Sequence, residues 1–229
     1  MTKLKRLMVA LVVGMVALPA TTNAFATDVD LGTASAFAVL AASTVTNTGP
    51  SVVTGDLGVY SGTAVTGFLP GVVIGGTHAG DAAAQQAQVD LGIAYDTAAG
   101  QDADASMAGD LQGMTMSPGV YRSSSSIDLT GTLTLDAAGD PDALWIFQMG
   151  STLTTASDSV VTLINSAQSC NVIWQVGSSA TLGTTSVFKG TIMADQSITL
   201  TNGATLNGRA LARIGAVTLA GNNVVMPTP

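Results

Sequence analysis

Apolar and polar positions repeat in a fixed unit along the C-terminal half of the chain. Each copy is a short apolar run that leads to a Thr-Leu pair, and the pairs are Thr152-Leu153, Thr181-Leu182, Thr199-Leu200 and Thr218-Leu219. The last three pairs are 18 and 19 residues apart, whereas the first two are 29 apart, which leaves room for an inserted loop. Short strands that recur at such a period predict a solenoid in which each copy forms one coil.

The N-terminal part of the chain carries further strand signals, followed by one helix. Short strands are predicted over residues 36–40, 44–48, 52–54, 57–60 and 63–68, and a Gly-rich connection over residues 69–80. From residue 81 to residue 99 the apolar positions recur at three- and four-residue steps, with Asp81 as N-cap and Gly100 as the stop. A single helix with a narrow Ala-rich stripe is unstable alone, so we expect it to pack along the strands.

The leucine of each pair is expected to point into the solenoid. Alternate side chains of a strand point inward, and each stacks on the same position of the next coil at roughly 4.8 Å. We therefore place the leucine column and both tryptophans, Trp145 and Trp174, in the core. The flanking threonines then share one exterior face, which comprises Thr152, Thr154, Thr181, Thr199, Thr201 and Thr218.

This predicted face carries no charged residue, although exposed strands ordinarily mix Lys, Glu and Arg among their threonines. The strand preference of threonine explains one exposed threonine. A charge-free column over four rows instead favours a partner that is itself flat and periodic. Threonine methyls constrain the neighbouring water and the hydroxyls bind it, so an ordered water layer can bridge the face to a solid, for which ice is the obvious candidate.

The first 26 residues have the pattern of a secretion signal. Three basic residues precede an apolar run over residues 7–18, and Ala24-Phe25-Ala26 fits a cleavage site. The apolar run is shorter than the roughly 20 residues that span a bilayer. We therefore predict a single exported domain at residues 27–229, extracellular with the periplasm as the alternative, and no membrane partner.

The composition limits the partners and the kinds of site that we expect for this chain. Without residues 1–26 the chain has four basic residues against fifteen aspartates, a formal charge of −11, so we expect no nucleic-acid partner. Cys170 is the only cysteine, which excludes an intramolecular disulfide, and His78, the only histidine, is expected to be solvated. We expect no metal and no cofactor. The carboxylates are scattered, so we do not expect an enzyme.

An ordered set of motifs covers nearly all of the chain after residue 26. The motifs are Leu31-Gly-Thr-Ala-Ser-Ala-Phe-Ala-Val-Leu40, Val53-Thr-Gly-Asp-Leu-Gly58, Pro118-Gly-Val-Tyr121, Trp145-Ile-Phe-Gln148, Val172-Ile-Trp-Gln-Val176 and Leu206-Asn-Gly-Arg-Ala-Leu211. In this order they resemble the bacterial and fungal ice-binding proteins, whose domain is a discontinuous β-solenoid with a long helix alongside.

The resemblance implies a right-handed discontinuous β-solenoid of about 18–20 residues per coil, in which the N-terminal strands rejoin the solenoid and the helix packs on one of three faces. Some members of the family carry a Thr-(Ala/Gly)-X-(Thr/Asn) ice-binding motif. Thr63-Ala64-Val65-Thr66 is one copy, which adds Thr63 and Thr66 to the predicted ice-binding residues. Many relatives also have a capping subdomain, and the short connection at residues 69–80 implies that it is minimal or absent here.

The sequence is therefore compatible with two classes of function. The first is an ice-binding (antifreeze) protein, expected to be a monomer, that adsorbs to ice through its threonine-rich face and inhibits ice growth and recrystallisation. The alternative is an extracellular adhesin, or a β-solenoid that binds or acts on polysaccharides. The chain lacks the Gly-Gly-X-Gly-X-Asp calcium repeats of one common type of adhesin.

Overall fold

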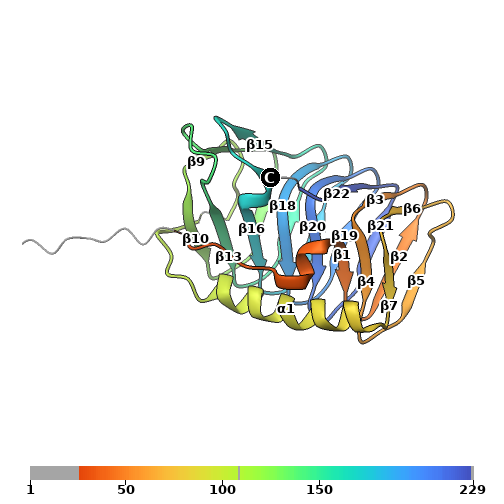
Figure 1. Cartoon of the computed structure of the whole chain (residues 1–229). Helices are drawn as coiled ribbons and strands as arrows, with labels where there is room; N and C mark the ends of the chain where they lie inside the picture. Colours follow the sequence, from red (N-terminus) through yellow and green to blue (C-terminus); the bar gives the residue numbers. More distant parts are fainter. Residues whose placement is uncertain (1–25, 108, 228–229) are drawn as a thin grey trace, which may run out of the picture.

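The computed structural model describes residues 26–107 and 109–227, which form a three-sided β-solenoid with one long helix along it (Figure 1). Two sides of the solenoid belong to a 15-stranded sheet and the third is a seven-stranded sheet. Strands of successive coils pair in parallel, so each side is a ladder of short strands. The predicted fold class is confirmed. The predicted secretion signal lies outside the described residues except for Ala26.

The first side of the 15-stranded sheet faces the helix. In stacking order it contains β8 (Ala105–Ser106), β10 (Gly119–Ser123), β13 (Trp145–Met149), β16 (Val172–Val176), the C-terminal halves of β18 (Val187–Ala194) and β20 (Thr205–Ala212), β1 (Phe37–Ala41), β4 (Asp56–Val59) and β7 (Thr77–Ala79).

The other two sides face away from the helix. The second side contains β9 (Thr115–Met116), β12 (Thr132–Asp136), β15 (Val160–Ile164), the N-terminal halves of β18 and β20, β22 (Asn223–Val225), β3 (Val52–Thr54) and β6 (Val72–Ile74). The third side, the seven-stranded sheet, contains β11 (Ile127–Leu129), β14 (Leu153–Thr155), β17 (Ala180–Leu182), β19 (Ile198–Leu200), β21 (Val217–Ala220), β2 (Thr44–Thr48) and β5 (Ala64–Thr66).

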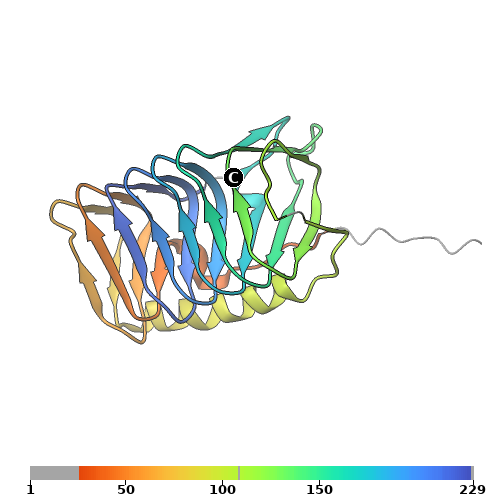
Figure 2. The same cartoon turned by 180° about the vertical axis from the view of Figure 1, so that it is seen from behind.

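The stacking order is discontinuous in sequence. The last C-terminal coil lies on the first N-terminal coil, because β20 pairs with β1, β21 with β2 and β22 with β3. The helix α1 (Ala82–Ala99) then carries the chain from β7 at one end of the stack to β8 at the other, as both views show (Figures 1 and 2). The N-terminal strands therefore rejoin the solenoid, as the family resemblance implied.

The segment predicted as a Gly-rich connection, residues 69–80, is only partly a connection. It contains β6 and β7, which pair with β3 and β4 and complete the last coil. Each strand has three residues, and glycines flank both of them. A Cβ at Gly75 would lie 2.3 Å from the Gly55 carbonyl oxygen, so this corner requires glycine for close backbone approach. The same glycines are the reason that the sequence predicted a connection here instead of two short strands.

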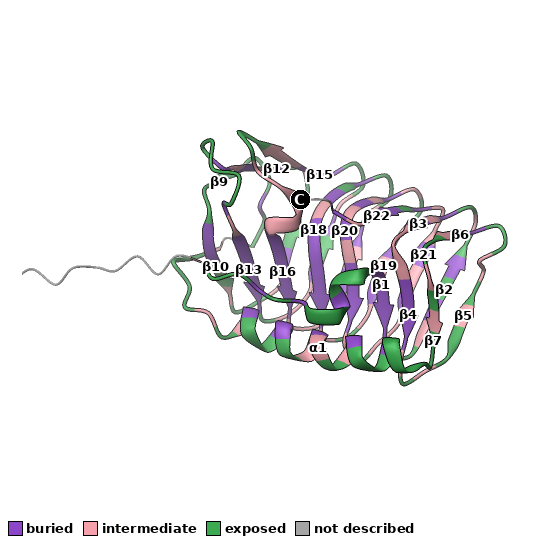
Figure 3. Ribbon diagram, viewed as in Figure 1, coloured by how far each residue is buried: buried purple, intermediate pink, exposed green. Residues whose placement is uncertain are grey.

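Apolar side chains fill the interior of the stack. Trp145 and Trp174 are fully buried, as predicted, and each indole donates a hydrogen bond, to the Met116 carbonyl at 3.2 Å and to the Lys189 carbonyl at 2.9 Å. The Phe147 and Trp174 rings stack at 4.1 Å between centroids. Of the strands facing the helix, β1, β13 and β16 are buried along their whole lengths (Figure 3). The tryptophans belong to the core, where their polar N–H groups are satisfied.

The helix covers the first side through the predicted stripe. Asp81 caps it by accepting a hydrogen bond from the Ala84 amide at 2.9 Å. The buried positions are Ala84, Ala87, Leu91, Ala94, Tyr95 and Ala98. The short 3-10 helix η1 (Gly32–Ala36) lies beside α1, where the Thr33 hydroxyl donates to Asp90 at 2.6 Å. This hydrogen bond is the main reason that the pKa of Asp90 is lowered.

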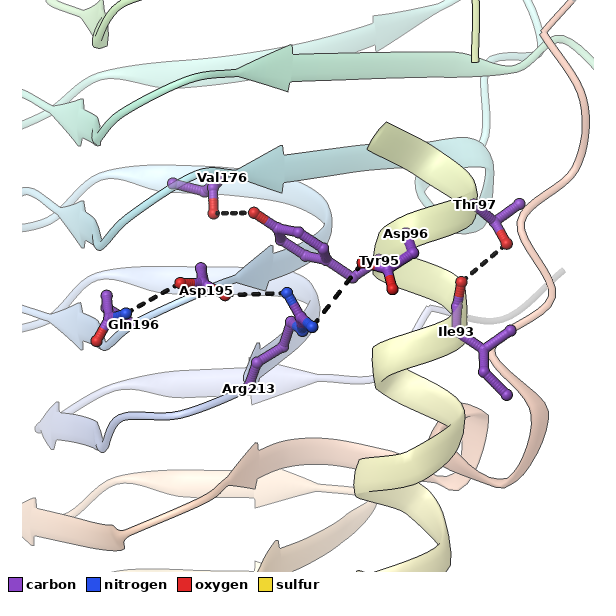
Figure 4. A network of polar contacts seen from close by, with 8 residues as sticks. All are labelled: Ile93, Tyr95, Asp96, Thr97, Val176, Asp195, Gln196 and Arg213. Atoms are coloured by element: carbon purple, nitrogen blue, oxygen red, sulfur yellow. Dashed lines mark hydrogen bonds and ion pairs between the residues drawn. The ribbon is translucent and has the colours of Figure 1, made fainter. Parts of the chain in front are cut away.

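A polar contact network, which we call the helix latch, fastens α1 to three successive coils (Figure 4). The Tyr95 hydroxyl donates to the Val176 carbonyl at 3.2 Å. The Arg213 guanidinium lies over the Tyr95 ring, 4.2 Å from its centroid, and pairs with Asp195 at 2.9 Å. Arg213 also lies 3.9 Å from Asp96 of α1, so the latch combines a hydrogen bond, a cation–π contact and two ion pairs.

Two residues of interest lie away from the latch. His78 was expected to be solvated, but it is half-buried, its Nδ1 lies 2.8 Å from Asp81 Oδ2, and its ring meets that of Phe37 edge-on at 5.4 Å. That expectation was wrong, because the start of the helix packs over the β7 edge. Cys170 lies in η2 (Ser169–Asn171), within the predicted inserted loop.

In the described part of the chain, no helix has the length and apolar character needed to cross a membrane.

Candidate functional site

Six threonines from six adjacent strands form one column on the outer surface of the seven-stranded sheet. The strand register pairs each with the next, in the order Thr154, Thr181, Thr199, Thr218, Thr46 and Thr66. Neighbouring rows of a sheet are roughly 4.8 Å apart. We call this set the central column, and the surface around it the threonine face.

The residues two positions before and after the central column form two flanking columns of small side chains. The first contains Thr152, Ser179, Ser197, Ala216, Thr44 and Ala64, and the second contains Ala156, Gly183, Thr201, Ala220 and Thr48. The sixth position of the second column is Phe68, which packs against the core. None of these residues is charged. A Cβ at Gly183 would lie 2.4 Å from the Ala156 carbonyl, so the close approach of the two rows requires glycine there. Small side chains on an extended sheet make the face flat.

The structure corrects the predicted alignment of the first row. The sequence repeat places Thr152 beside Thr181, but Leu153 pairs with Ala180 and Thr154 pairs with Thr181. Thr152 therefore lies in a flanking column, where its hydroxyl is 2.9 Å from Ser126 Oγ. The alignment failed because Thr155, which is buried and accepts a hydrogen bond from the Gly183 amide at 2.9 Å, stands where a leucine was expected.

The eight predicted site residues therefore divide into three groups. Thr66, Thr154, Thr181, Thr199 and Thr218 lie in the central column. Thr152 and Thr201 lie in the flanking columns, and the Thr201 hydroxyl donates to the Leu182 carbonyl at 2.8 Å. Thr63 precedes β5 and lies outside the columns, at a corner beside Gly80. A Cβ at Gly80 would lie 2.6 Å from Thr63 Cγ2.

Three residues of the threonine face were missing from the predicted site. Thr44, Thr46 and Thr48 all point outward from β2, whose inward residues are Val45 and Asn47. The strand itself was predicted with the observed bounds, and its alternating threonines were the available signal. What the sequence lacked was the pairing of β2 with β21, which inserts this row between Thr218 and Thr66.

The central column presents hydroxyls that are free to bind water. Within the described part of the chain, none of the six side chains makes a hydrogen bond to another protein group. Thr46, Thr66 and Thr154 are exposed, and the other three are half-buried between their neighbours. Each threonine also carries a methyl group, so the column combines apolar and hydrogen-bonding groups that repeat at the spacing of the strands.

Acidic groups bound the face at the end next to β11. Asp128 of β11 pairs with Thr154, so an aspartate occupies the position that would extend the central column by one more row. Asp110 accepts a hydrogen bond from the Thr130 hydroxyl at 2.6 Å, which lowers the pKa of Asp110 and keeps its carboxylate charged. The uncharged surface therefore begins at the Thr154 row.

The second side of the solenoid is also open, but it is less regular. Its outward residues include Lys189 and Asp136, and bulkier apolar residues such as Val72 and Ile74 are exposed there. The loop that contains η2 also contacts it, because Ser169 bonds Asn207 at 2.8 Å. The first side is covered by α1. Within residues 26–107 and 109–227, the threonine face is the one side that is open, flat and uncharged over several rows.

Comparison with known proteins places this geometry in context. A family model described as "Ice-binding-like" matches residues 39–225. The chain is 55% identical to an ice-binding protein of Nostoc sp. (strain HG1) over 196 residues, which cover 85% of this chain and 72% of that protein.

Solved structures agree with the sequence comparison. A crystal structure of an ice-binding protein from the Antarctic ascomycete Antarctomyces psychrotrophicus superposes with a TM-score of 0.86 at 43% identity, covering 89% of this chain and all of the other. An ice-binding protein from an Antarctic biological consortium gives a TM-score of 0.88 at 48% identity, covering 89% of this chain and 93% of the other.

Proposed function

Because the chain belongs to the ice-binding protein family, we propose that it adsorbs to ice through the threonine face and inhibits ice growth and recrystallisation. The observation that carries this proposal is the central column, six in-register threonines without a charged neighbour in their rows. Regularity and lack of charge fit a partner that is flat, periodic and neutral.

The chemistry of the face supports binding through ordered water. Methyl groups on an apolar strand surface restrict the orientation of adjacent water. The free threonine hydroxyls hydrogen-bond the same layer, and water that bridges two surfaces is nearly as favourable as a direct contact. A water layer held at the strand spacing can merge with a crystal front. The crystal then grows only between adsorbed molecules, and the curved front stops advancing.

Thermal hysteresis of the purified protein tests this function. We expect a gap between the melting and freezing points together with faceted ice crystals, and ice that grows normally in its presence would contradict the proposal. The alternative, an adhesin or polysaccharide-directed protein, predicts retention on an insoluble polysaccharide without ice shaping. The proposal includes no catalytic activity, no nucleic-acid or membrane partner, no metal or cofactor, and a monomer in solution.

Secretion is part of the same proposal, because ice forms outside the cell. Cleavage after Ala26 would leave Thr27 as the first residue. The Thr27 amide donates to Gln101 Oε1 at 2.8 Å, and the Gln101 side-chain amide donates to the Thr27 carbonyl at 2.7 Å, just past the end of α1. These contacts support a domain that starts at residue 27. N-terminal sequencing of protein from the culture medium would test it, and an intact residue 1 would contradict it.

A further inference from the structure

The threonine face is assembled from two segments of chain that are not joined at the point where they meet. The rows of β14, β17, β19 and β21 follow the helix in sequence, and the rows of β2 and β5 precede it. Within each segment, the turns of the coil fix how one row lies on the next. Between β21 and β2 no such connection exists, so the register there depends on the strand ladder and on side chains.

The pattern of β2 does not fix this register by itself. Its outward residues are Thr44, Thr46 and Thr48, so a slip of two residues would still present threonines outward. Such a slip would nevertheless move every threonine of the row by about 6.6 Å along the strand. A threonine of β2 would still lie beside Thr218, but Ala64 or Phe68 would replace Thr66, so the β5 row would no longer continue the central column.

A buried polar cluster lies at the corner where the two segments meet. Asn47, Ser51 and Asn222 are 6%, 0% and 2% exposed. The Ser51 hydroxyl donates to Asn47 Oδ1, and the same hydroxyl oxygen accepts a hydrogen bond from the Asn222 backbone amide at 2.9 Å. Ser51 and Asn222 are 171 residues apart in sequence. The cluster therefore joins the N-terminal segment to the C-terminal segment.

The two asparagines extend the cluster to the coils on either side. The Asn222 side-chain amide donates to the Thr201 carbonyl at 2.7 Å and to the Ala204 carbonyl at 3.0 Å, in the preceding C-terminal turn. The Asn47 side-chain amide donates to the Gly67 carbonyl at 2.6 Å, in the following N-terminal turn. The hydrogen bonds thus cross successive turns on both sides of the break.

The equivalent positions in the continuous coils are less polar. In the coil of β14 and β15 they hold Thr155 and Ser159, which are buried and hydrogen-bond backbone groups rather than each other. Asn47 pairs with Leu219, so it occupies the inward column in which Leu182 and Leu200 stand in the rows below. At the position of Asn222, the preceding coils carry Ala204 and Ser186. The Ser186 hydroxyl has no hydrogen-bond partner within the described residues. Buried polar residues therefore occur at this corner in other coils too, but among the described residues the linked hydrogen bonds of Asn47, Ser51 and Asn222 belong to the break.

We infer that Asn47, Ser51 and Asn222 form a register clamp, which aligns Thr46 and Thr66 with the four C-terminal rows and so positions one continuous ice-binding face. The inference rests on the proposed function. Its physical basis is that a slip of the row would separate buried polar groups from their partners, whereas an apolar column tolerates the slip. A single buried asparagine sets the register of coiled coils in the same way.

The substitution Ser51→Ala tests the clamp, and Ser186→Ala is the matched control at an equivalent corner of a continuous coil. Hysteresis is measured at equal concentration, with the folded fraction at the same temperature from circular dichroism. We expect Ser51→Ala to lower hysteresis per folded molecule at least in proportion to the one row of six, that of β5, which loses its threonine from the central column. Ser186→Ala should match the wild type. A purely structural role would lower the folded fraction without changing hysteresis per folded molecule.

A second variant and a rescue keep the test decisive if Ser51→Ala is poorly folded. Asn47→Thr places at the break the residue that Thr155 supplies in the same column, and it should lose hysteresis similarly. Val52→Cys with Asn223→Cys, on a Cys170→Ser background, can lock the register from the second side, because these two residues pair across the break. Neighbouring strands lie within disulfide reach. In clamp variants the oxidised pair should restore hysteresis and the reduced pair should not.

The outcomes separate the clamp from the proposed function. A wild-type protein without hysteresis would refute the function itself. Full hysteresis in both Ser51→Ala and Asn47→Thr, beside an inactive Thr199→Tyr, would overturn the clamp alone. A loss of hysteresis that the disulfide fails to restore, in protein that is fully folded, would also overturn it.

Discussion

The helix latch gives a quantitative prediction about how α1 is held on the solenoid. Removing the Tyr95 hydroxyl with Tyr95→Phe should cost about 0.5–1.5 kcal/mol, the usual range for a hydrogen bond. We expect the low end of this range, because the Val176 carbonyl also accepts from the Asp195 backbone amide at 3.0 Å and stays satisfied. The Phe ring would keep its contact with Arg213.

Replacing Arg213 with alanine should cost more, because a cation–π contact and two ion pairs are lost, of which the pair with the exposed Asp96 at 3.9 Å contributes little. The cation–π contact at 4.2 Å contributes about 0.5–2 kcal/mol. The ion pair with Asp195 joins side chains that are about one quarter exposed, and it adds about 0.2–1 kcal/mol after screening. For a domain of this size, each kcal/mol lowers the melting temperature by about 2–4 °C. Arg213→Ala should therefore melt several degrees below the wild type.

A double-mutant cycle isolates the contact between the two side chains. Tyr95→Leu, Arg213→Ala and the double variant would be unfolded with guanidinium and followed by circular dichroism. We expect a coupling free energy of about 0.5–1.5 kcal/mol. Additive costs, with coupling below about 0.3 kcal/mol, would refute the latch as an energetic unit. Hysteresis per folded molecule should stay unchanged in all three variants, because the latch lies on the side of the solenoid that faces the helix.

Two further predictions concern the acid stability and the core. The pKa of Asp90 is lowered from its ordinary value by the hydrogen bond from Thr33. Its contribution to the unfolding free energy is therefore present above the ordinary aspartate pKa and is lost as pH falls through the lower folded-state pKa. Asp90→Asn should therefore show a flatter decline of unfolding free energy in acid than the wild type, and equal slopes would contradict this. Leu200→Ala removes a fully buried side chain and should cost about 2–5 kcal/mol in guanidinium unfolding, whereas a cost below about 1 kcal/mol would mean that the leucine column is loosely packed.

The bounds and the buried stripe of the helix could be predicted from local sequence patterns. The three- and four-residue spacing predicted residues 81–99, and α1 is Ala82–Ala99 with Asp81 as its cap. The expected buried stripe is the observed one, because helix burial depends on a period that can be read within a single segment. The strands β2 and β3 were also predicted with the observed bounds, since alternating residues bounded by glycine and proline are a local signal.

The site depended on pairing between distant segments, and there the sequence was less informative. The threonines of the C-terminal repeats were visible from their spacing. However, the row of Thr46 joins the central column only through the pairing of β2 with β21. The misplacement of Thr152 has a similar cause, because a buried threonine, Thr155, replaced the leucine that marked the other rows. A period-2 pattern identifies which side chains face outward, but it leaves shifts of two residues undetermined.

The central claim, that the protein binds ice through the threonine face, is tested most directly by comparing hysteresis in Thr199→Tyr and Thr205→Tyr. Both threonines are half-buried on neighbouring coils, but Thr199 lies in the middle of the central column and Thr205 points outward from the second side. Both proteins should be folded near 0 °C by circular dichroism. We predict that Thr199→Tyr abolishes hysteresis and that Thr205→Tyr keeps the wild-type value. Full hysteresis in Thr199→Tyr, or its loss only in Thr205→Tyr, would contradict the claim.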